Sequence, residues 1–300
     1  MADSMEHTYT TDFNSALDHA LQQKRSVLID TFNRSGSRVR GEKKRIIERL
    51  EPQEAERITG KHQQSNPRVQ TWEQRWITGH RYRNQRLVDK ADRLLRISDP
   101  TNPMVQSVRY SLFRAADRQE AIPAFFGPAY AGEDGNTVKT FPTGANDANN
   151  VTAAGATAAN YLAAVTAGLQ KLEDEEVDLM EEPVHAVIPP AVKRILFGDV
   201  TVTSGDYHPT RGIIESYKLP PMYGVNWIVH TGMKAAVSGN YEVPLYTKMG
   251  MQFEEWDEME AIVDRRPDFN HDWQIAGYHW MGAARSDEKR VIRLKLPVPG

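Results

Sequence analysis

Apolar positions at three- and four-residue steps predict a long helix over residues 103–126. The stripe consists of Val105, Val108, Leu112, Ala115, Gln119, Ile122 and Phe126. Asn102 is a suitable N-cap, Pro103 suits the first helical position, and Gly127-Pro128 ends the run. Such a helix would be about 36 Å long. Pro123 lies inside the pattern and is expected to kink or loosen the last turn.

Further apolar runs predict the other elements. Residues 157–176 are typical of a second amphipathic helix, and residues 191–198 of a short one. Strands are predicted within 184–190 and over 225–230, 242–247, 258–264, 273–281 and 290–296. The turn-rich stretch 130–150 indicates a hairpin or loop. Near the start, residues 13–32 have helical spacing and predict a short amphipathic arm. The fold class is therefore α+β, with mixed sheets and two principal helices.

The stretch 68–86, "RVQTWEQRWITGHRYRNQR", has a different pattern. If it is extended, Trp72, Gln74, Trp76 and Thr78 share one face and Glu73, Arg75 and Ile77 share the other. Two mixed faces favour a strand outside a closed core, and residues 34–90 together indicate a projecting two-stranded ribbon. Because such a ribbon is barely stable alone in water, it needs a surface to lie on. We expect that surface to come from another molecule, and the removal of residues 36–86 to leave a folded body.

Composition is that of a globular protein, since 40% of the 300 residues are hydrophobic. No run approaches the roughly 18 apolar residues that span a bilayer, and the polar start is unlike a secretory signal. The chain has no cysteine, which excludes disulfides, thiolate metal sites and a cysteine nucleophile. This composition fits a reducing compartment such as a cytoplasm.

The net charge of −3 hides an asymmetry along the chain. Residues 31–100 carry 17 Lys and Arg against 9 Asp and Glu, a net charge of +8. The other 230 residues carry 20 basic and 31 acidic groups, a net charge of −11. The basic section is either a solvated face or a surface that attracts something acidic, which would be nucleic acid or the acidic body of another copy.

Candidate catalytic groups are sparse. Asp206, His208 and Arg211 lie close together in "GDYHPTRG", but no serine nucleophile stands in a strand–turn–helix frame. The acidic run 173–182 lacks the ligand alternation of a calcium loop and is typical of a solvated helix end. Phosphate-loop, dinucleotide and zinc-protease motifs are absent from the sequence. We therefore expect no enzyme activity, no cofactor and no metal site.

The aromatic and arginine side chains of the ribbon leave two interpretations. They could stack single-stranded bases. Glu73 interrupts the positive run, however, and tryptophan, tyrosine and arginine are the residues enriched at the centres of protein interfaces. We favour intersubunit contacts, and the candidate residues are Trp72, Arg75, Trp76, Arg81, Tyr82 and Arg83.

This order of parts resembles the major capsid proteins of tailed bacteriophages with the Hong Kong-type capsid fold. The most specific segments are "GDYHPTRGIIESYKLPPMYGVNWIVH" and the series that runs from "VPLYTKMG" through Trp256, "DRRPDFN" and "GAAR" to the last strand. The resemblance covers most of the chain. Pro123 inside the long helix departs from the family pattern, and no long extension precedes the arm, so no fused scaffolding segment is expected.

The resemblance implies a division of the chain into five parts. These are an N-terminal arm over 1–33, an extended loop over 34–90, a peripheral domain over 91–184 with a spine helix at 103–126 and the second helix, a mainly axial domain over 185–245, and return strands of the peripheral domain over 246–300. In the family, the extended loop lies across a neighbouring subunit, which is the role that a ribbon with two mixed faces would suit.

The function implied is that of a major capsid protein, which assembles as hexamers and pentamers into an icosahedral shell around a double-stranded DNA genome. Implied partners are further copies of the chain, separate scaffolding, portal and decoration proteins, and packaged DNA on the inner face, with no membrane. The protein would be located in the virion after assembly in the host cytoplasm. The alternative is the shell protein of a bacterial encapsulin-type nanocompartment that encloses a cargo enzyme.

Overall fold

The structure is a computed structural model that describes residues 22–36, 38–57, 59, 69–88, 101–142, 149–198, 217, 219–235 and 239–299. The chain forms two compact units. The larger contains Ser26–His80, Ala116–Asp257 and Met281–Gly300, and the smaller contains Met1–Arg25, Arg81–Ala115 and Glu258–Trp280. Each unit is described separately below.

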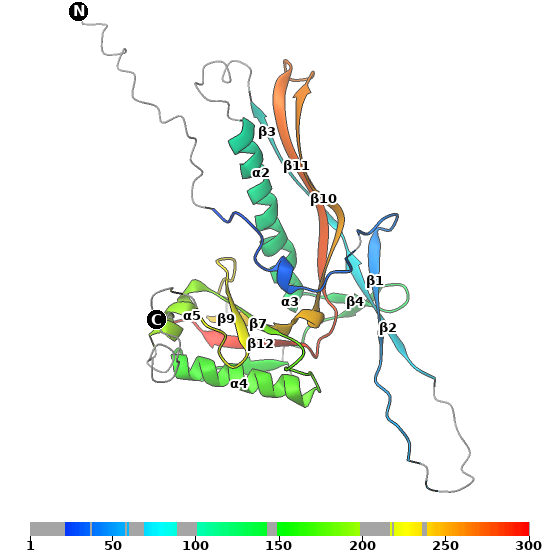
Figure 1. Cartoon of the computed structure of the whole chain (residues 1–300), viewed down its shortest axis with the longest axis vertical. Helices are drawn as coiled ribbons and strands as arrows, with labels where there is room; N and C mark the ends of the chain where they lie inside the picture. The colour runs from blue at the N-terminus through cyan, green and yellow to red at the C-terminus, as the bar shows by residue number, and fades with distance from the viewer. Residues whose placement is uncertain are drawn as a thin grey trace, which may run out of the picture. The chain divides into compact units, whose positions relative to one another are not determined.

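The core of the larger unit lies on a five-stranded mixed sheet with the order β6-β12-β9-β7-β8. The strands are β6 (Asn150–Thr152), β7 (Val184–Ile188), β8 (Val225–Val229), β9 (Asn240–Thr247) and β12 (Val291–Pro297). Two helices, α4 (Ala158–Asp174) and α5 (Pro190–Phe197), bury their apolar faces with this sheet in one cluster (Figure 1). The predicted second helix, the short helix and the strands at 184–190 and 225–230 are therefore confirmed.

Helix α4 shows why this part follows the sequence pattern closely. The hydroxyl of Thr157 caps the helix by accepting a hydrogen bond from the backbone N–H of Asn160 at 3.3 Å. Tyr161, Val165 and Leu172 are buried on its inner face. At Gly168 a Cβ would lie 2.8 Å from Leu245 of β9, so the helix approaches the sheet most closely where it has no side chain.

A second sheet of the larger unit has the order β1-β2-β4-β5. Its strands are β1 (Lys44–Leu50), β2 (Trp72–Thr78), β4 (Ala129–Ala131) and β5 (Thr137–Lys139). All neighbouring pairs are antiparallel. The predicted two-stranded ribbon is thus present as β1 and β2, and the predicted hairpin at 130–150 as β4 and β5. The 3₁₀ turn η4 (Lys248–Gly250) follows β9 in the same unit.

The smaller unit is built from one helix and three strands. Helix α2 (Thr101–Ala115) lies along a sheet with the order β10-β11-β3 (Figure 1). The strands are β3 (His80–Val88), β10 (Met251–Arg266) and β11 (Asp272–Arg285), whose ends belong to the larger unit. Val108 packs with Val88 and Ile275. A Cβ on Gly277 would lie 2.4 Å from Val108, so glycine permits this close contact.

The long helix predicted over 103–126 is interrupted. Helix α2 ends at Ala115, the π-helical turn η3 covers Ala116–Ala121, and α3 covers Ile122–Phe126. Pro123 has no N–H to donate to the preceding turn, and the widened turn occurs directly before it. The sequence predicted a disturbance at Pro123, but it placed the disturbance in the last turn instead of one turn earlier.

The predicted helical arm over 13–32 is wrong for its described residues. Residues 22–28 are not helical, and only the short 3₁₀ turn η2 (Ile29–Thr31) follows. The carboxylate of Asp117 in η3 accepts the backbone N–H groups of Val27 at 3.0 Å and Leu28 at 3.4 Å. These two N–H groups therefore donate to a side chain and do not form the backbone hydrogen bonds of a helix. Leu28 and Phe32 are fully buried, so this segment belongs to the core of the larger unit.

The C-terminal strands were predicted correctly in type, but their ends differ. The run predicted at 258–264 lies almost entirely in the C-terminal half of β10, which extends seven residues further toward the N-terminus. Residues 251–254 of that extension are buried, so their two-sided burial hides the alternation by which a strand is recognised.

Candidate intersubunit surface

The ribbon formed by β1 and β2 has two chemically distinct faces. Its register pairs Lys44 with Thr78, Ile46 with Trp76, and Leu50 with Trp72. Side chains that are directly paired lie on the same face of an antiparallel sheet. One face therefore carries the two tryptophans, and the other carries Arg75, Ile77 and their partners on β1.

The face with Arg75 and Ile77 is covered by the chain itself. Arg75 is 1% exposed and Ile77 is fully buried. A Cβ on Gly282, near the C-terminal end of β11, would lie 2.4 Å from the carbonyl oxygen of Thr78, so the backbones approach closely there. The expectation of two mixed, uncovered faces is therefore wrong: one face of the ribbon base is core. Deletion of residues 36–86 would remove this core and strands of two sheets.

Arg75 is held by carboxylates of its own chain. Its guanidinium pairs with Glu288, and its Nη2 lies 3.2 Å from the carboxylate of Glu73. Glu73 also pairs with Lys139 of β5 and with Arg49 of β1. Arg49 in turn reaches Asp287 at 2.7 Å. These ion pairs tie the ribbon to the segment before β12, and they neutralise within the chain part of the basic excess of residues 31–100.

The ion pairs lower the pKa of the Glu73 carboxyl. Burial alone would raise this pKa, but the hydrogen bond from Lys139 and the positive charges of Arg75 and Arg49 outweigh burial. Glu73 thus stays ionised in the folded subunit to a lower pH than a free glutamate does. At neutral pH, ion pairs therefore help to hold the ribbon.

The opposite face of the four-stranded sheet carries an exposed apolar row, with the polar pair of Glu48 and Gln74 beside it on the ribbon. The registers align Ile46 with Trp76, Trp76 with Tyr130, and Tyr130 with Val138, which gives one row across all four strands. Ile46, Tyr130 and Val138 are 37%, 41% and 52% exposed. Nearer the far end of the ribbon, Trp72 is 62% exposed beside its partner Leu50. Contiguous exposed apolar side chains of this kind mark interaction surfaces.

Trp76 is the ordered centre of this face. Its indole N–H donates to the carbonyl oxygen of Gly132 at 2.6 Å, and the ammonium of Lys44 lies 5.7 Å from the ring centroid. Gly135 has a φ of +65°, which glycine adopts without strain, and its backbone turns against the indole ring of Trp76. A Cβ on Gly135 would lie 2.8 Å from that ring. The β4–β5 hairpin therefore holds the Trp76 side chain in one orientation.

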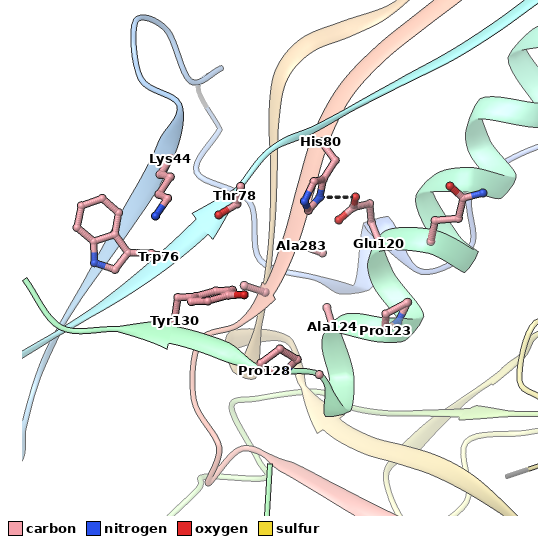
Figure 2. Close-up of a pocket in the computed structure, with 13 residues that line it drawn as sticks. Lys44, Trp76, Thr78, His80, Glu120, Pro123, Ala124, Pro128, Tyr130 and Ala283 are labelled. Carbon is pink, nitrogen blue, oxygen red and sulfur yellow. Dashed lines mark hydrogen bonds and ion pairs between the residues drawn. The ribbon is translucent and has the colours of Figure 1, made fainter. Parts of the chain in front are cut away.

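An open pocket lies beside Trp76 (Figure 2). Its volume is about 490 Å³. Trp76 and Tyr130 line one part, while Pro123, Ala124 and Pro128 from α3 and its C-terminal end line another. At its edge, Nδ1 of His80 lies 2.9 Å from the carboxylate of Glu120. The lining combines these aromatic and aliphatic side chains with the polar side chains of Lys44, Thr78, His80, Gln119 and Glu120.

The remaining predicted contact residues lie in β3 of the smaller unit. Arg81 and Arg83 are exposed, and Tyr82 is half-buried. The guanidinium of Arg81 stacks over the ring of Trp280, 4.3 Å from its centroid. The six predicted residues therefore divide between two units. Trp72, Trp76, Arg81, Tyr82 and Arg83 retain surface for a partner, whereas Arg75 has an internal role.

Sequence reasoning missed the apolar residues that complete the surface. Ile46 and Leu50 occupy alternate positions of "KRIIERL", a weak strand signal inside a highly charged segment. Tyr130 and Val138 lie in three-residue strands, which are too short to show a period. Only the pairing register reveals that these residues share a face with Trp76.

Other sequence candidates gain no support. Asp206, His208 and Arg211 lie outside the described residues. Among the residues that the structure does describe, no group of three or more His, Asp or Glu side chains could hold a metal ion. The acidic run 173–182 covers the end of α4 and the turn after it. Within the described parts of the chain, no helix has the length and apolarity needed to cross a membrane.

Comparison with solved structures identifies the fold. The capsid of cyanophage Pam1 matches with a TM-score of 0.74 at 14% identity, covering 100% of both chains. The mature capsid of bacteriophage PhiM1 matches with a TM-score of 0.71 at 12% identity over 95% of this chain and 91% of that one. The capsid of a native GTA particle matches with a TM-score of 0.70 at 13% identity over 99% of each chain.

Comparison of the sequence with protein families leads to the same conclusion. No curated protein sequence matches the chain. The model of the phage capsid protein family, however, matches residues 5–298. The Hong Kong-type α+β fold implied by the sequence resemblance is confirmed, and the nanocompartment alternative is not favoured. The chain therefore belongs to the phage capsid protein family, and its role is that of a structural protein of the virion capsid.

Proposed function

We propose that this chain is the major capsid subunit of a tailed phage and assembles as hexamers and pentamers into an icosahedral shell around double-stranded DNA. The observation that carries the proposal is the ribbon with its exposed apolar face on a capsid fold. A monomer gains nothing by exposing Trp72, Tyr130 and Val138 together, whereas a shell subunit can bury them against the next copy.

The proposal extends to the division of the chain and its partners. The ribbon within residues 34–90 is the extended loop that lies over a neighbour, α2 and α3 form the spine, and residues 185–245 contribute mainly to the axial domain. The exposed residues Trp72, Trp76, Arg81, Tyr82 and Arg83 supply intersubunit contacts. Assembly takes place in the host cytoplasm with separate scaffolding, portal and decoration proteins, and DNA is packaged against the inner face.

The physical basis of such a shell is the repetition of modest contacts. Aromatic side chains bury a large area at low entropic cost, and exposed arginines guide association. Each subunit makes the same contacts with its neighbours on both sides. Once some of these contacts have formed, the remaining ones form between partners that are already held together, so they are effectively intramolecular. Individually weak interfaces can then give a durable particle.

The test is negative-stain electron microscopy and sedimentation of the purified chain over a range of concentrations. We expect closed shells, tubes or capsomer-sized rings above a threshold concentration. A protein that stays monomeric at every concentration, also after addition of a crowding agent, would contradict self-assembly. Nuclease-protected DNA inside particles from infected cells distinguishes a genome shell from a compartment that holds a cargo protein.

A further inference from the structure

The far end of the ribbon exposes more apolar surface than its base. Trp72 is 62% exposed, its cross-strand partner Leu50 is 45% exposed, and Val69 is 94% exposed. In the described residues, no other tryptophan is among the large hydrophobic side chains that are mainly solvent-exposed. Tryptophan is the residue most typical of an interface anchor, and such anchors enter pockets.

The pocket beside Trp76 has the properties of a receptor for such a side chain. Its volume of about 490 Å³ is within the usual range for sites that bind small molecules or side chains. Trp76 and Tyr130 offer aromatic surfaces, and Pro123, Ala124 and Pro128 offer rigid aliphatic ones (Figure 2). A planar indole would bury its area there with little loss of side-chain freedom in the walls.

A subunit does not reach its own pocket with its own Trp72. The pocket lies at the base of the ribbon, where Lys44 pairs with Thr78, and Trp72 pairs with Leu50 six residues further along β1. Six residues of extended strand span about 20 Å. The anchor and the pocket are thus separate features of the subunit, and a second copy of the chain is the partner that brings the matching anchor to the pocket.

Charge favours the same pairing. The segment directly after Leu50 carries the exposed carboxylates of Glu51 and Glu54. The receiving pocket is lined by Lys44, whose ammonium lies near the Trp76 ring, while His80 of the same pocket is paired with the carboxylate of Glu120. The acidic segment beside the anchor would therefore meet the ammonium of Lys44 on one side of the pocket, which guides docking and sets its orientation.

We propose that Trp72 of one copy inserts into the pocket formed by Trp76, Tyr130, Pro123, Ala124 and Pro128 of the next copy. The contact joins two different patches, so it is head-to-tail and closes into a ring when the rotation between copies permits. This inference rests on the proposed function and names the contact that links subunits within a capsomer.

The direct test uses the absence of natural cysteines. Leu50→Cys with Ala124→Cys places one thiol beside Trp72 and the other in the pocket wall, and both changes keep small apolar side chains. Under mild oxidation of assembled protein, we expect a ladder of disulfide-linked oligomers on non-reducing gels, ending at five or six copies. The matched control, Leu50→Cys with Met180→Cys, carries a second thiol on a residue that is 96% exposed outside the pocket, and it should give no ladder.

The outcomes separate the two levels of the proposal. Shells or rings that form normally while the Leu50–Ala124 pair gives no more cross-linking than the control would overturn the pocket contact and leave the proposed function intact. A ladder that ends in closed rings supports both. Failure of the wild-type chain itself to assemble contradicts the proposed function, and the pocket contact with it.

A second pair of variants tests the anchor without new thiols. Trp72→Ala should weaken subunit association on the order of 30-fold, the effect of removing an interface anchor, whereas Trp72→Phe should retain most of the association. Ala124→Phe, which fills the pocket from within, should weaken association as Trp72→Ala does. Combining Trp72→Ala with Ala124→Phe should add little further loss. Full additivity of the two effects would contradict a shared contact.

Discussion

At the scale of single residues, the ribbon base depends on buried charge. Arg75 is almost completely buried, and Glu288 and Glu73 compensate its charge. Removing one partner of a buried ion pair leaves the other uncompensated, which costs far more than losing an exposed charge. Arg75 therefore acts on folding, and an effect of its mutation on assembly would be indirect.

Arg75→Met keeps the volume of the side chain and removes its charge. We expect the free energy of unfolding to fall by about 3 kcal/mol, measured by denaturant titration of unassembled subunits. Arg83→Met, an exposed arginine of β3, is the control and should stay within about 0.5 kcal/mol of wild type. Equal stability of the two variants would show that the Arg75 pairs contribute nothing.

The ion pairs of Glu73 imply a pH dependence of subunit stability. Its folded-state pKa is lowered from the usual value of 4.5, so its contribution to stability is fully present above that value. The contribution is lost as pH falls from about 4.5 through the lower folded pKa. Stability measured from pH 7 to 3 should therefore drop more steeply for wild type than for Glu73→Gln. Glu48→Gln, on the exposed face of β1, should leave the slope unchanged.

At the scale of elements, helix α2 is held by its contact with the sheet of the smaller unit. Val108 is fully buried against Val88 and Ile275, and Gly277 lets the strand approach. Val108→Asp should prevent folding, because an unpaired carboxylate at that position costs several kcal/mol. Arg109→Asp, on the exposed side of the same helix, is the matched control and should fold with the usual circular dichroism. A soluble, cooperatively unfolding Val108→Asp protein would contradict this placement.

For the ribbon, the sequence predicted the two strands but not that one of its faces is buried in the subunit's own core. Removing residues 51–71 and joining Leu50 to Trp72 through Asn-Gly should leave a folded subunit, because two-residue Asn-Gly turns suit antiparallel hairpins. We expect its thermal midpoint to stay within a few degrees of the parent. The larger deletion of residues 36–86 should instead abolish cooperative unfolding, since Ile77 and Arg75 are removed from the core.

Sequence patterns predicted the elements with a clear helical period or a short, bounded apolar run. Helix α4 follows its apolar period, β7 and β12 are short apolar runs buried on both faces, and the apolar residues of all three form one cluster. The patterns failed where tertiary contacts replaced local ones. Asp117 captures backbone donors of Val27 and Leu28, which no local rule foresees. Likewise, Arg75 is typical of a surface residue by type, and only its carboxylate partners from distant segments explain its burial.

At the scale of the whole molecule, exposed charge and buried aromatic surface should control different steps of assembly. Arg81→Glu with Arg83→Glu should slow association, measured by light scattering, and raised salt should slow wild type in the same direction. Once particles have formed, Trp76→Ala should accelerate their dissociation on dilution, because burial of the Trp76 face holds neighbouring subunits together. Salt does not weaken this burial, in contrast to the attraction between exposed charges. Arg81→Gln with Arg83→Gln is the neutral control and should slow association less. A charge-reversed protein that assembles at the normal rate but loses bound DNA would show that β3 faces nucleic acid.

The central claim is that this chain builds a shell through a ribbon that reaches from one copy to the next. The most direct measurement is a cryo-electron microscopy map of particles assembled from the purified chain. The account predicts five- and six-fold capsomers in which the β1–β2 ribbon crosses onto the neighbouring subunit, with the Trp72 side chain in density against Tyr130 and Pro128 of that neighbour. A map in which each ribbon folds back on its own subunit, or in which the apolar row of Ile46, Trp76, Tyr130 and Val138 faces solvent in the finished shell, would contradict it.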